Sequence, residues 1–327
     1  EPNMLMRFAS VSKLITAVGI MKLQEMKKLK MNEKVFGPKG ILNDTTYNNS
    51  IKDQRYYNIT VEQLLRHQAG FNNYAGDPVS STRYIMMQNH LTTPPDHKTL
   101  LKILLKRHLG YTPGEGKCYS NLGYMILSMI IEKKSRMKYE NFMQKYVLQP
   151  AGCYDMHIAG TYYKDRRPNE TKYYMHKGSI PVYEYNNSGR MVEKCYGDTD
   201  LPRLSGAGAW CGSAAELSRL IASIDGMPHV KDILSKKSIQ FMTTEQPDHQ
   251  YSIGWNYTPK SNRPWIRTGS LAGTSAIVLK YPDGQCWILI TNTSTWKGHG
   301  FSNDTVAFFE KLRKQFMADM PKKDLFI

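Results

Sequence analysis

The sequence has no apolar run long enough to cross a membrane as a helix. Its longest apolar stretches, at residues 125–131 and 276–279, are far shorter than the roughly 18 residues that a membrane-spanning helix requires. No signal peptide is visible, but the chain begins with Glu1 and Pro2 instead of a methionine. We therefore expect a soluble folded chain from which an upstream segment has been removed.

Cysteine is also scarce. The chain has 5 cysteines, and none of them forms a C-x-x-C pair with another. Disulfide-rich small domains and structural zinc sites use denser or more regular cysteine patterns. The sequence therefore predicts neither a disulfide framework nor a bound metal.

Acidic residues are outnumbered by basic ones, 28 to 44, which gives a formal net charge of +16. Such an excess is typical of nucleic-acid-binding proteins, but no RNP motif, zinc finger or basic region with heptads is present. The densest basic stretches are interrupted by Leu, Ile or Met at helical spacing. We expect a solvated basic surface that faces anionic polymers or lipid headgroups, and no nucleic-acid partner.

The 327 residues, 41% of them hydrophobic, are enough for one large domain with a substantial core. Helices are predicted at residues 10–31, from 60, at 98–108, 121–134 and 139–147, from 213, and at 303–317. Residues 160–200 show no sustained period and are predicted to be loop. Short strands are predicted at 265–269, 274–281 and 286–291, with a hairpin turn at 282–284. This order predicts an α+β domain in which an antiparallel sheet is flanked by helices and carries an all-α insertion. We place the α/β lobe at about 1–58 and 205–327, and the helical lobe at about 59–204.

The start of the first predicted helix carries a serine and a lysine one turn apart, Ser10 and Lys13. A helix N-terminus offers free N–H groups and a positive dipole end, which favour an oxyanion. A lysine in an apolar site loses its proton more readily and can serve as base toward the serine. The same S-x-x-K spacing recurs at Ser135/Lys138 and Ser294/Lys297, but only the first pair opens a buried helix.

Two further segments carry polar groups suited to a cleft. Tyr119 and Asn121 lie where a loop containing Pro113 and Gly114 meets a predicted helix. In the first predicted strand, Arg267 and Thr268 are followed by Gly269, whose small size would let a substrate backbone approach the strand edge.

These segments resemble the penicillin-recognising serine hydrolases, most of all the branch with class C β-lactamases, D-alanyl-D-alanine carboxypeptidases and related esterases. The matching segments, in chain order, are RFASVSKLITA, LLRHQAGF, TPGEGKCYSNLGYMIL, GAGAWCGSAAELSRL and RTGSLAGTSAIV. They cover nearly the whole chain. The resemblance implies a β-lactamase/transpeptidase-like fold with the active site in the cleft between its two lobes, and a place outside the cytoplasm.

The resemblance also implies a role for each matching residue. Ser10 is the expected nucleophile and Lys13 its general base, while Tyr119 protonates the leaving group or shares the base role. Asn121, Thr268 and Gly269 are expected to contact substrate, and the N–H groups of Ser10 and Ser270 to form the oxyanion hole. His67 matches a family histidine that is usually structural. The implied reaction is acyl transfer through an ester on Ser10, which needs no metal or organic cofactor, by a monomer acting on a small molecule or a peptidoglycan peptide.

Two departures from the family pattern stand out. Arg267 replaces a lysine or histidine, and its guanidinium does not release a proton but binds a carboxylate well. It is therefore expected to bind a substrate carboxylate, or else to pair with an acidic side chain of its own chain. Only nine residues precede Ser10, where the family has a helix and the first strands of the sheet; we expect that this segment was trimmed or that the sheet loses an edge.

Three functions stay open from the sequence. The first is a serine hydrolase acting on D-amino-acid peptides or β-lactams. The second is an esterase or D-aminopeptidase on the same scaffold, because the fold does not determine the acyl group. The third is a penicillin-binding sensor that does not turn over.

Overall fold

The computed structural model describes residues 3–74, 76–246, 251–294 and 298–316. Its main sheet has three antiparallel strands in the order β6 (Trp265–Leu271), β7 (Thr274–Lys280) and β8 (Cys286–Thr291). The predicted turn between β7 and β8 is present, and Gly284 in it has a φ of +94°, which favours glycine. The sheet is therefore built from the three runs that the sequence predicts.

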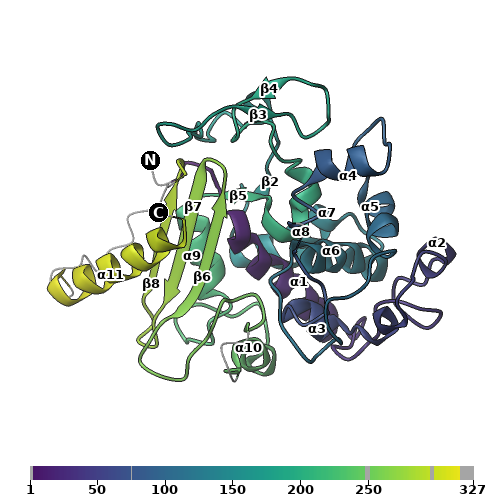
Figure 1. Ribbon diagram of the computed structural model, residues 1–327. Coiled ribbons are helices and arrows are strands. Elements are labelled where there is room, and N and C mark those ends of the chain that lie inside the picture. The colour runs from purple at the N-terminus through teal and green to yellow at the C-terminus, as the bar shows by residue number, and fades with distance from the viewer. Residues whose placement is uncertain (1–2, 75, 247–250, 295–297, 317–327) are drawn as a thin grey trace.

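Both faces of this sheet are covered, so that every residue of β7 is buried. Ile277 and Leu279 point to one face, where they pack with Phe309 of α11 (His299–Phe316). Ala276 and Val278 point to the other face and join the main core of the molecule. Figure 1 shows α11 on one side of the sheet and α9 (Ala214–Ala222) on the other.

Helix α1 (Ser12–Glu25) lies between the sheet and the helices α6 (Asn121–Ser135) and α7 (Tyr139–Met143) (Figure 1). It is apolar almost all round, with residues 12–21 all buried, as expected of a helix in the centre of a core. The other helices are α2 (Thr45–Asn48), α3 (Val61–Leu65), α4 (Thr82–Gln88), α5 (His97–Leu104), α8 (Ser205–Gly208) and α10 (Lys236–Thr243). No helix in the described part of the chain has the length and apolar composition that spanning a membrane would take.

Capping signals place two helix starts correctly. The side chain of Thr60 accepts the backbone N–H of Gln63, and the side chain of Gln63 in turn accepts the backbone N–H of Thr60. Ser213 and Glu216 form the same reciprocal pair at the start of α9. Both contacts are local in sequence, which is why the pattern alone reveals them.

Other predicted bounds are wrong. The first helix ends at Glu25 instead of residue 31, and Ser10 precedes it in a separate 3₁₀ turn, Ala9–Val11. The segment 160–200, predicted to be loop, contains a short hairpin of β3 (Val182–Tyr183) and β4 (Met191–Val192). Strands of two residues are too short to show a period in the sequence. The last helix begins earlier than predicted, at His299, and residue 317 lies outside the described residues.

A second small sheet lies beside the nucleophile segment. It contains β1 (Met6–Arg7), β5 (Trp210–Gly212) and β2 (His157–Ile158) in the order β1-β5-β2. Its strands come from three distant parts of the chain, and the sequence pattern predicts none of them.

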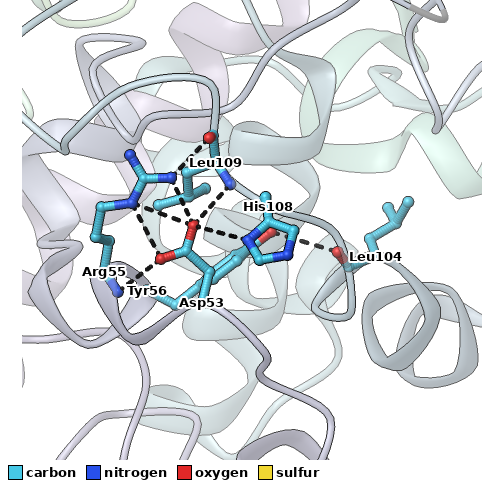
Figure 2. A network of polar contacts seen from close by, with 6 residues as sticks. All are labelled: Asp53, Arg55, Tyr56, Leu104, His108 and Leu109. Carbon is cyan, nitrogen blue, oxygen red and sulfur yellow. Dashed lines mark hydrogen bonds and ion pairs between the residues drawn. The ribbon is translucent and has the colours of Figure 1, made fainter.

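Asp53 links residues before the predicted helical lobe to the segment that follows α5 (Figure 2). Its carboxylate accepts hydrogen bonds from the side chain of Arg55 and from the backbone N–H of Leu109, at 3.0 Å. Nearby, the Tyr56 hydroxyl donates to the Leu104 carbonyl. The residues predicted to end the α/β lobe thus pack on the helical part. The two-lobe division itself stays a prediction.

We expect Asp53→Ala to lower the free energy of unfolding by about 1–3 kcal/mol, because the buried Leu109 N–H loses its acceptor. Arg55 is partly exposed, so its ion pair adds little. The hydrogen bond from Arg55 holds the pKa of Asp53 below its ordinary value. The stabilisation is therefore present above about pH 4 and is lost as pH falls toward the lowered pKa.

Urea unfolding of both proteins at neutral pH and at about pH 3 checks this prediction. The difference between them should shrink at the lower pH. As a control, Lys98→Ala removes only the exposed pair between Lys98 and Asp44 and should leave unfolding unchanged. An Asp53 variant as stable as wild type at neutral pH would contradict the prediction.

Candidate active site

The backbone around Ser10 is held in an unusual conformation. Ala9, directly before it, is fully buried and has a φ of +49°, a region that non-glycine residues rarely adopt. Strand β6 comes so close that a Cβ on Gly269 would lie 2.5 Å from the Phe8 carbonyl oxygen and 2.9 Å from the Ser10 nitrogen. The space next to Gly269, expected to admit substrate backbone, is thus occupied at these points by the chain's own nucleophile turn.

Lys13 is fully buried beneath Ser10. Its Nζ lies 3.2 Å from Ser10 Oγ, 2.6 Å from Asn121 Oδ1 and 2.7 Å from the Ala207 carbonyl oxygen. The predicted contact between Ser10 and Lys13 is confirmed. Asn121 is placed by the start of α6, where its own N–H donates to Asp77, 3.1 Å away.

The Tyr119 hydroxyl donates to Ser10 Oγ at 2.7 Å, so the predicted convergence of the three side chains is present. Tyr119 also receives a hydrogen bond from Arg267 Nη2, at 3.3 Å. The Nε of Arg267 donates to the Ser10 carbonyl oxygen at 2.8 Å, and its side chain is 1% exposed. Among the described residues, Arg267 forms no ion pair with an acidic side chain, so it joins the nucleophile turn to Tyr119.

Burial and charge shift the proton affinities of this cluster. Burial lowers the pKa of Lys13 below its ordinary value, and the charge of Arg267 adds to this shift. Burial opposes ionisation of Tyr119, but the charges of Lys13 and Arg267 outweigh it and lower the pKa of Tyr119 to about 8. Both groups can therefore change protonation state nearer to neutral pH than usual.

His67 supports Tyr119 and does not contact Ser10. Its Nδ1 accepts the backbone N–H of Ser120 at 3.1 Å, and its ring packs on Tyr119, 4.6 Å between centroids. Burial and the charges of Lys13 and Arg267 hold the pKa of His67 well below its ordinary value, so the ring is neutral. This agrees with the structural role expected for it.

A cavity of about 510 Å³ opens over this cluster. Five of the predicted site residues line it, namely Ser10, Tyr119, Thr268, Gly269 and Ser270. Lys13, Asn121 and Arg267 are not among the lining residues. The cavity therefore presents the hydroxyl groups, with the amine and the guanidinium beneath them.

Six lining residues were not predicted from the sequence: Tyr251, Asn256, Ser275, Gly298, Phe301 and Ser302. Asn256 accepts the N–H of Thr268 at 2.9 Å, and the Tyr251 ring packs on His67 at 4.7 Å. Ser275 lies in the segment RTGSLAGTSAIV, but the other five come from segments without a motif, and only the tertiary fold brings them to the cavity.

Comparison with known proteins agrees with this geometry. The family model described as Beta-lactamase matches residues 1–309. The chain belongs to the Beta-lactamase family. In this member of the family, Ser10 lies in the 3₁₀ turn Ala9–Val11 and Lys13 at the start of α1. Of the other S-x-x-K spacings, Ser135 ends α6 and Lys297 lies outside the described residues.

Individual relatives of this Beta-lactamase family member are distant. A penicillin-binding protein of Bacillus subtilis (strain 168) is 25% identical over 298 residues, which cover 86% of this chain and 59% of that protein. Protein flp of Staphylococcus aureus is 25% identical, over 89% of this chain and 53% of its own length. The chain thus spans little more than half the length of these two relatives.

Solved structures agree on the β-lactamase/transpeptidase-like fold. A penicillin-binding protein from Bacillus halodurans has a TM-score of 0.70 at 18% identity, over 95% of this chain and 87% of that one. The D-amino acid amidase from Ochrobactrum anthropi SV3, complexed with D-phenylalanine, has a TM-score of 0.67 at 18% identity, over 95% and 93%. The predicted α+β fold class is confirmed.

Proposed function

We propose that this chain is an extracytoplasmic serine hydrolase that forms an acyl-enzyme on Ser10 and acts on D-amino-acid peptides or β-lactams. One observation carries the proposal: Ser10 Oγ lies 3.2 Å from Lys13 Nζ and 2.7 Å from the Tyr119 hydroxyl, at the base of a cavity. A hydroxyl between an amine and a phenol of lowered pKa has a base and an acid within reach.

The three partners of Lys13 fit the protonation state that the reaction needs. A protonated amine donates to all three oxygens. A neutral amine has two N–H groups, enough for Asn121 Oδ1 and the Ala207 carbonyl, and its lone pair then faces the Ser10 hydroxyl. The two fixed acceptors thus orient the lone pair toward the nucleophile.

The proposed reaction has two steps. In the first, Ser10 Oγ attacks the substrate carbonyl as its proton passes to Lys13, and the N–H groups of Ser10 and Ser270 stabilise the oxyanion. Tyr119 then gives a proton to the leaving group as its bond to the acyl carbon breaks, and the proton on Lys13 passes back to Tyr119. In the second step, water attacks the ester on Ser10 and restores the hydroxyl. Thr268, which lines the cavity, positions the substrate, whereas Asn121, expected from the sequence to contact substrate, instead holds Lys13.

The proposed substrate class rests on the family to which the chain belongs and on the names of its relatives. The relatives include penicillin-binding proteins, and one structural neighbour is an amidase for D-amino acids. The extracytoplasmic location rests on the same relatives, and the net charge of +16 suits a surface near anionic polymers. We propose that the chain acts as a monomer without a nucleic-acid partner.

Incubation with a fluorescent penicillin, followed by gel and mass analysis, tests the proposal. A β-lactamase releases the hydrolysed drug, and a penicillin-binding protein keeps an adduct on Ser10. No adduct, with hydrolysis of simple esters or D-amino-acid amides, would point instead to an esterase or D-aminopeptidase. No adduct and no hydrolysis of any of these would refute the hydrolase.

Arg267 offers a separate prediction. Because it is buried and donates to Ser10 and Tyr119, we expect Arg267→Ala to lower kcat/KM by about 10- to 100-fold, the range for a charge-assisted hydrogen bond. The loss should be equal for an ester with a free carboxylate and for its methylated twin. Arg267→Lys should restore part of it on both. A loss confined to the free acid would instead support the carboxylate anchor predicted from the sequence.

A further inference from the structure

Apart from the cavity, the small sheet β1-β5-β2 carries a cluster of three side chains of metal-ligating type. The ligand atoms of His157, Glu170 and Cys211 all lie within 4.8 Å of one another, and all three residues are buried. In a tetrahedral zinc site the ligands lie roughly 3.3–3.8 Å apart, given metal–ligand bonds of about 2.0–2.3 Å. Closing around an ion would take movements of only about 1 Å.

The backbone holds these residues in place. His157 of β2 pairs directly with Cys211 of β5, so their side chains share one face of the sheet. Glu170 is brought to that face by Leu5, whose N–H and carbonyl bond to the residues on either side of Glu170. The cluster is thus part of the folded backbone and does not depend on a surface loop.

In His157 and Glu170, the polar atom that is not offered to the ion already has a hydrogen-bond partner. His157 Nδ1 lies 2.9 Å from the Asp155 carbonyl oxygen, and because a carbonyl only accepts, Nδ1 carries the proton. Glu170 Oε1 accepts from the Tyr173 hydroxyl at 2.8 Å. Hydrogen bonds of this kind orient the histidine and carboxylate ligands of metal sites.

The inner atoms of His157 and Glu170 then face each other, and Glu170 Oε2 also accepts the backbone N–H of Arg167 at 3.2 Å. His157 Nε2 lies 3.8 Å from Glu170 Oε2, and a neutral ring would point a lone pair at a carboxylate there. A cation between them, a proton on the ring, or the hydrogen of the Cys211 thiol would relieve this contact. Arg7 does not, because its Nη1 and Nη2 donate to the carbonyls of Cys195 and Gly160.

We propose that His157, Glu170 and Cys211 form a structural site for one Zn²⁺ ion. Nitrogen, sulfur and oxygen ligands together suit zinc, whereas calcium and magnesium take oxygen ligands. A thiolate and a carboxylate balance the double charge of the ion. The ion would tie β5 and β2 to the segment around Glu170, next to β1, which leads to Ser10. The absence of C-x-x-C pairs does not bear on such a site, because its ligands are far apart in the sequence.

Cobalt provides the test on the intact protein. After dialysis against a chelator, one equivalent of Co²⁺ should give visible bands of a tetrahedral ion and a near-ultraviolet band of a cobalt–thiolate bond, and Zn²⁺ should abolish both. Cys211→Ser should lose the thiolate band and weaken binding by at least about 100-fold. Cys153→Ser is the matched control, because Cys153 is equally buried but its thiol contacts the Glu216 carbonyl.

X-ray absorption of the zinc-loaded wild type gives a second readout in case Cys211→Ser does not fold. It should show one sulfur at about 2.3 Å together with nitrogen or oxygen ligands. A wild type without the thiolate band, or a Cys211→Ser protein that keeps it, would overturn the site and leave a proton-mediated pair of His157 and Glu170. Neither readout depends on hydrolytic activity, so the result is independent of the proposed function.

Discussion

Replacing Ser10 by alanine is expected to abolish hydrolysis, with a loss on the order of 10⁴-fold or more in kcat. The variant lacks the Oγ that lies between Lys13 and Tyr119, the atom proposed to form the acyl ester. Folding should change by less than about 1 kcal/mol, because the side chain is small. Lys13 also keeps its contacts with Asn121 and Ala207, and Tyr119 keeps that with Arg267. Thermal unfolding and turnover of the best substrate measure the two effects.

Ser135→Ala is the matched control, since Ser135 belongs to the same S-x-x-K spacing but ends helix α6. It should retain full activity and full labelling by a penicillin. Residual turnover of Ser10→Ala near the wild-type rate would mean that the chemistry lies elsewhere.

Replacing Lys13 by methionine is expected to lower kcat by about 10²- to 10⁴-fold, the usual contribution of a positioned base. Methionine keeps much of the length, but its thioether sulfur is far too weak a base to take the Ser10 proton. In the wild type, the acylation rate should fall as pH drops below the lowered pKa of Lys13, because the protonated amine has no lone pair to accept that proton. This acid limb should vanish from the residual activity of Lys13→Met.

Pre-steady-state labelling over a pH series measures this limb. If an acid limb survives in the variant, it belongs to Tyr119, and the phenol rather than the amine is the base. It should then lie above pH 8, because the charge of Lys13, which helps to lower the pKa of Tyr119 to about 8 in the wild type, is gone. Lys22→Met controls for changes to helix α1, because Lys22 lies near its other end and donates to the Ile233 carbonyl. It should acylate at the wild-type rate at every pH.

Local patterns were enough to predict much of this molecule. The capping boxes at Thr60 and Ser213 involve residues three apart, so the helix starts they define do not depend on the rest of the chain. The strands β6 to β8 follow from short β-type runs and a Pro-Asp-Gly turn. The serine–lysine pair follows from helical spacing, and the order of the motifs pointed to the family before any contact was known.

The details of the site were decided by segments far apart in the sequence. Strand β6 comes so close to the nucleophile turn that only a glycine fits at position 269, and Ala9 is held at positive φ. Arg267 donates to Ser10 and Tyr119, a use of its charge that spacing cannot indicate.

The cluster of His157, Glu170 and Cys211 shows most clearly what the sequence pattern alone could not predict. Two of its residues lie on strands of two or three residues, and the third, Glu170, forms an isolated β-bridge with Leu5. Short strands have no period of their own and exist because their hydrogen-bonding partners are supplied by the rest of the fold. Spacing along the chain reports contacts within one helix or hairpin. The pairing of distant strands follows from how the whole core packs, and only the tertiary structure shows it.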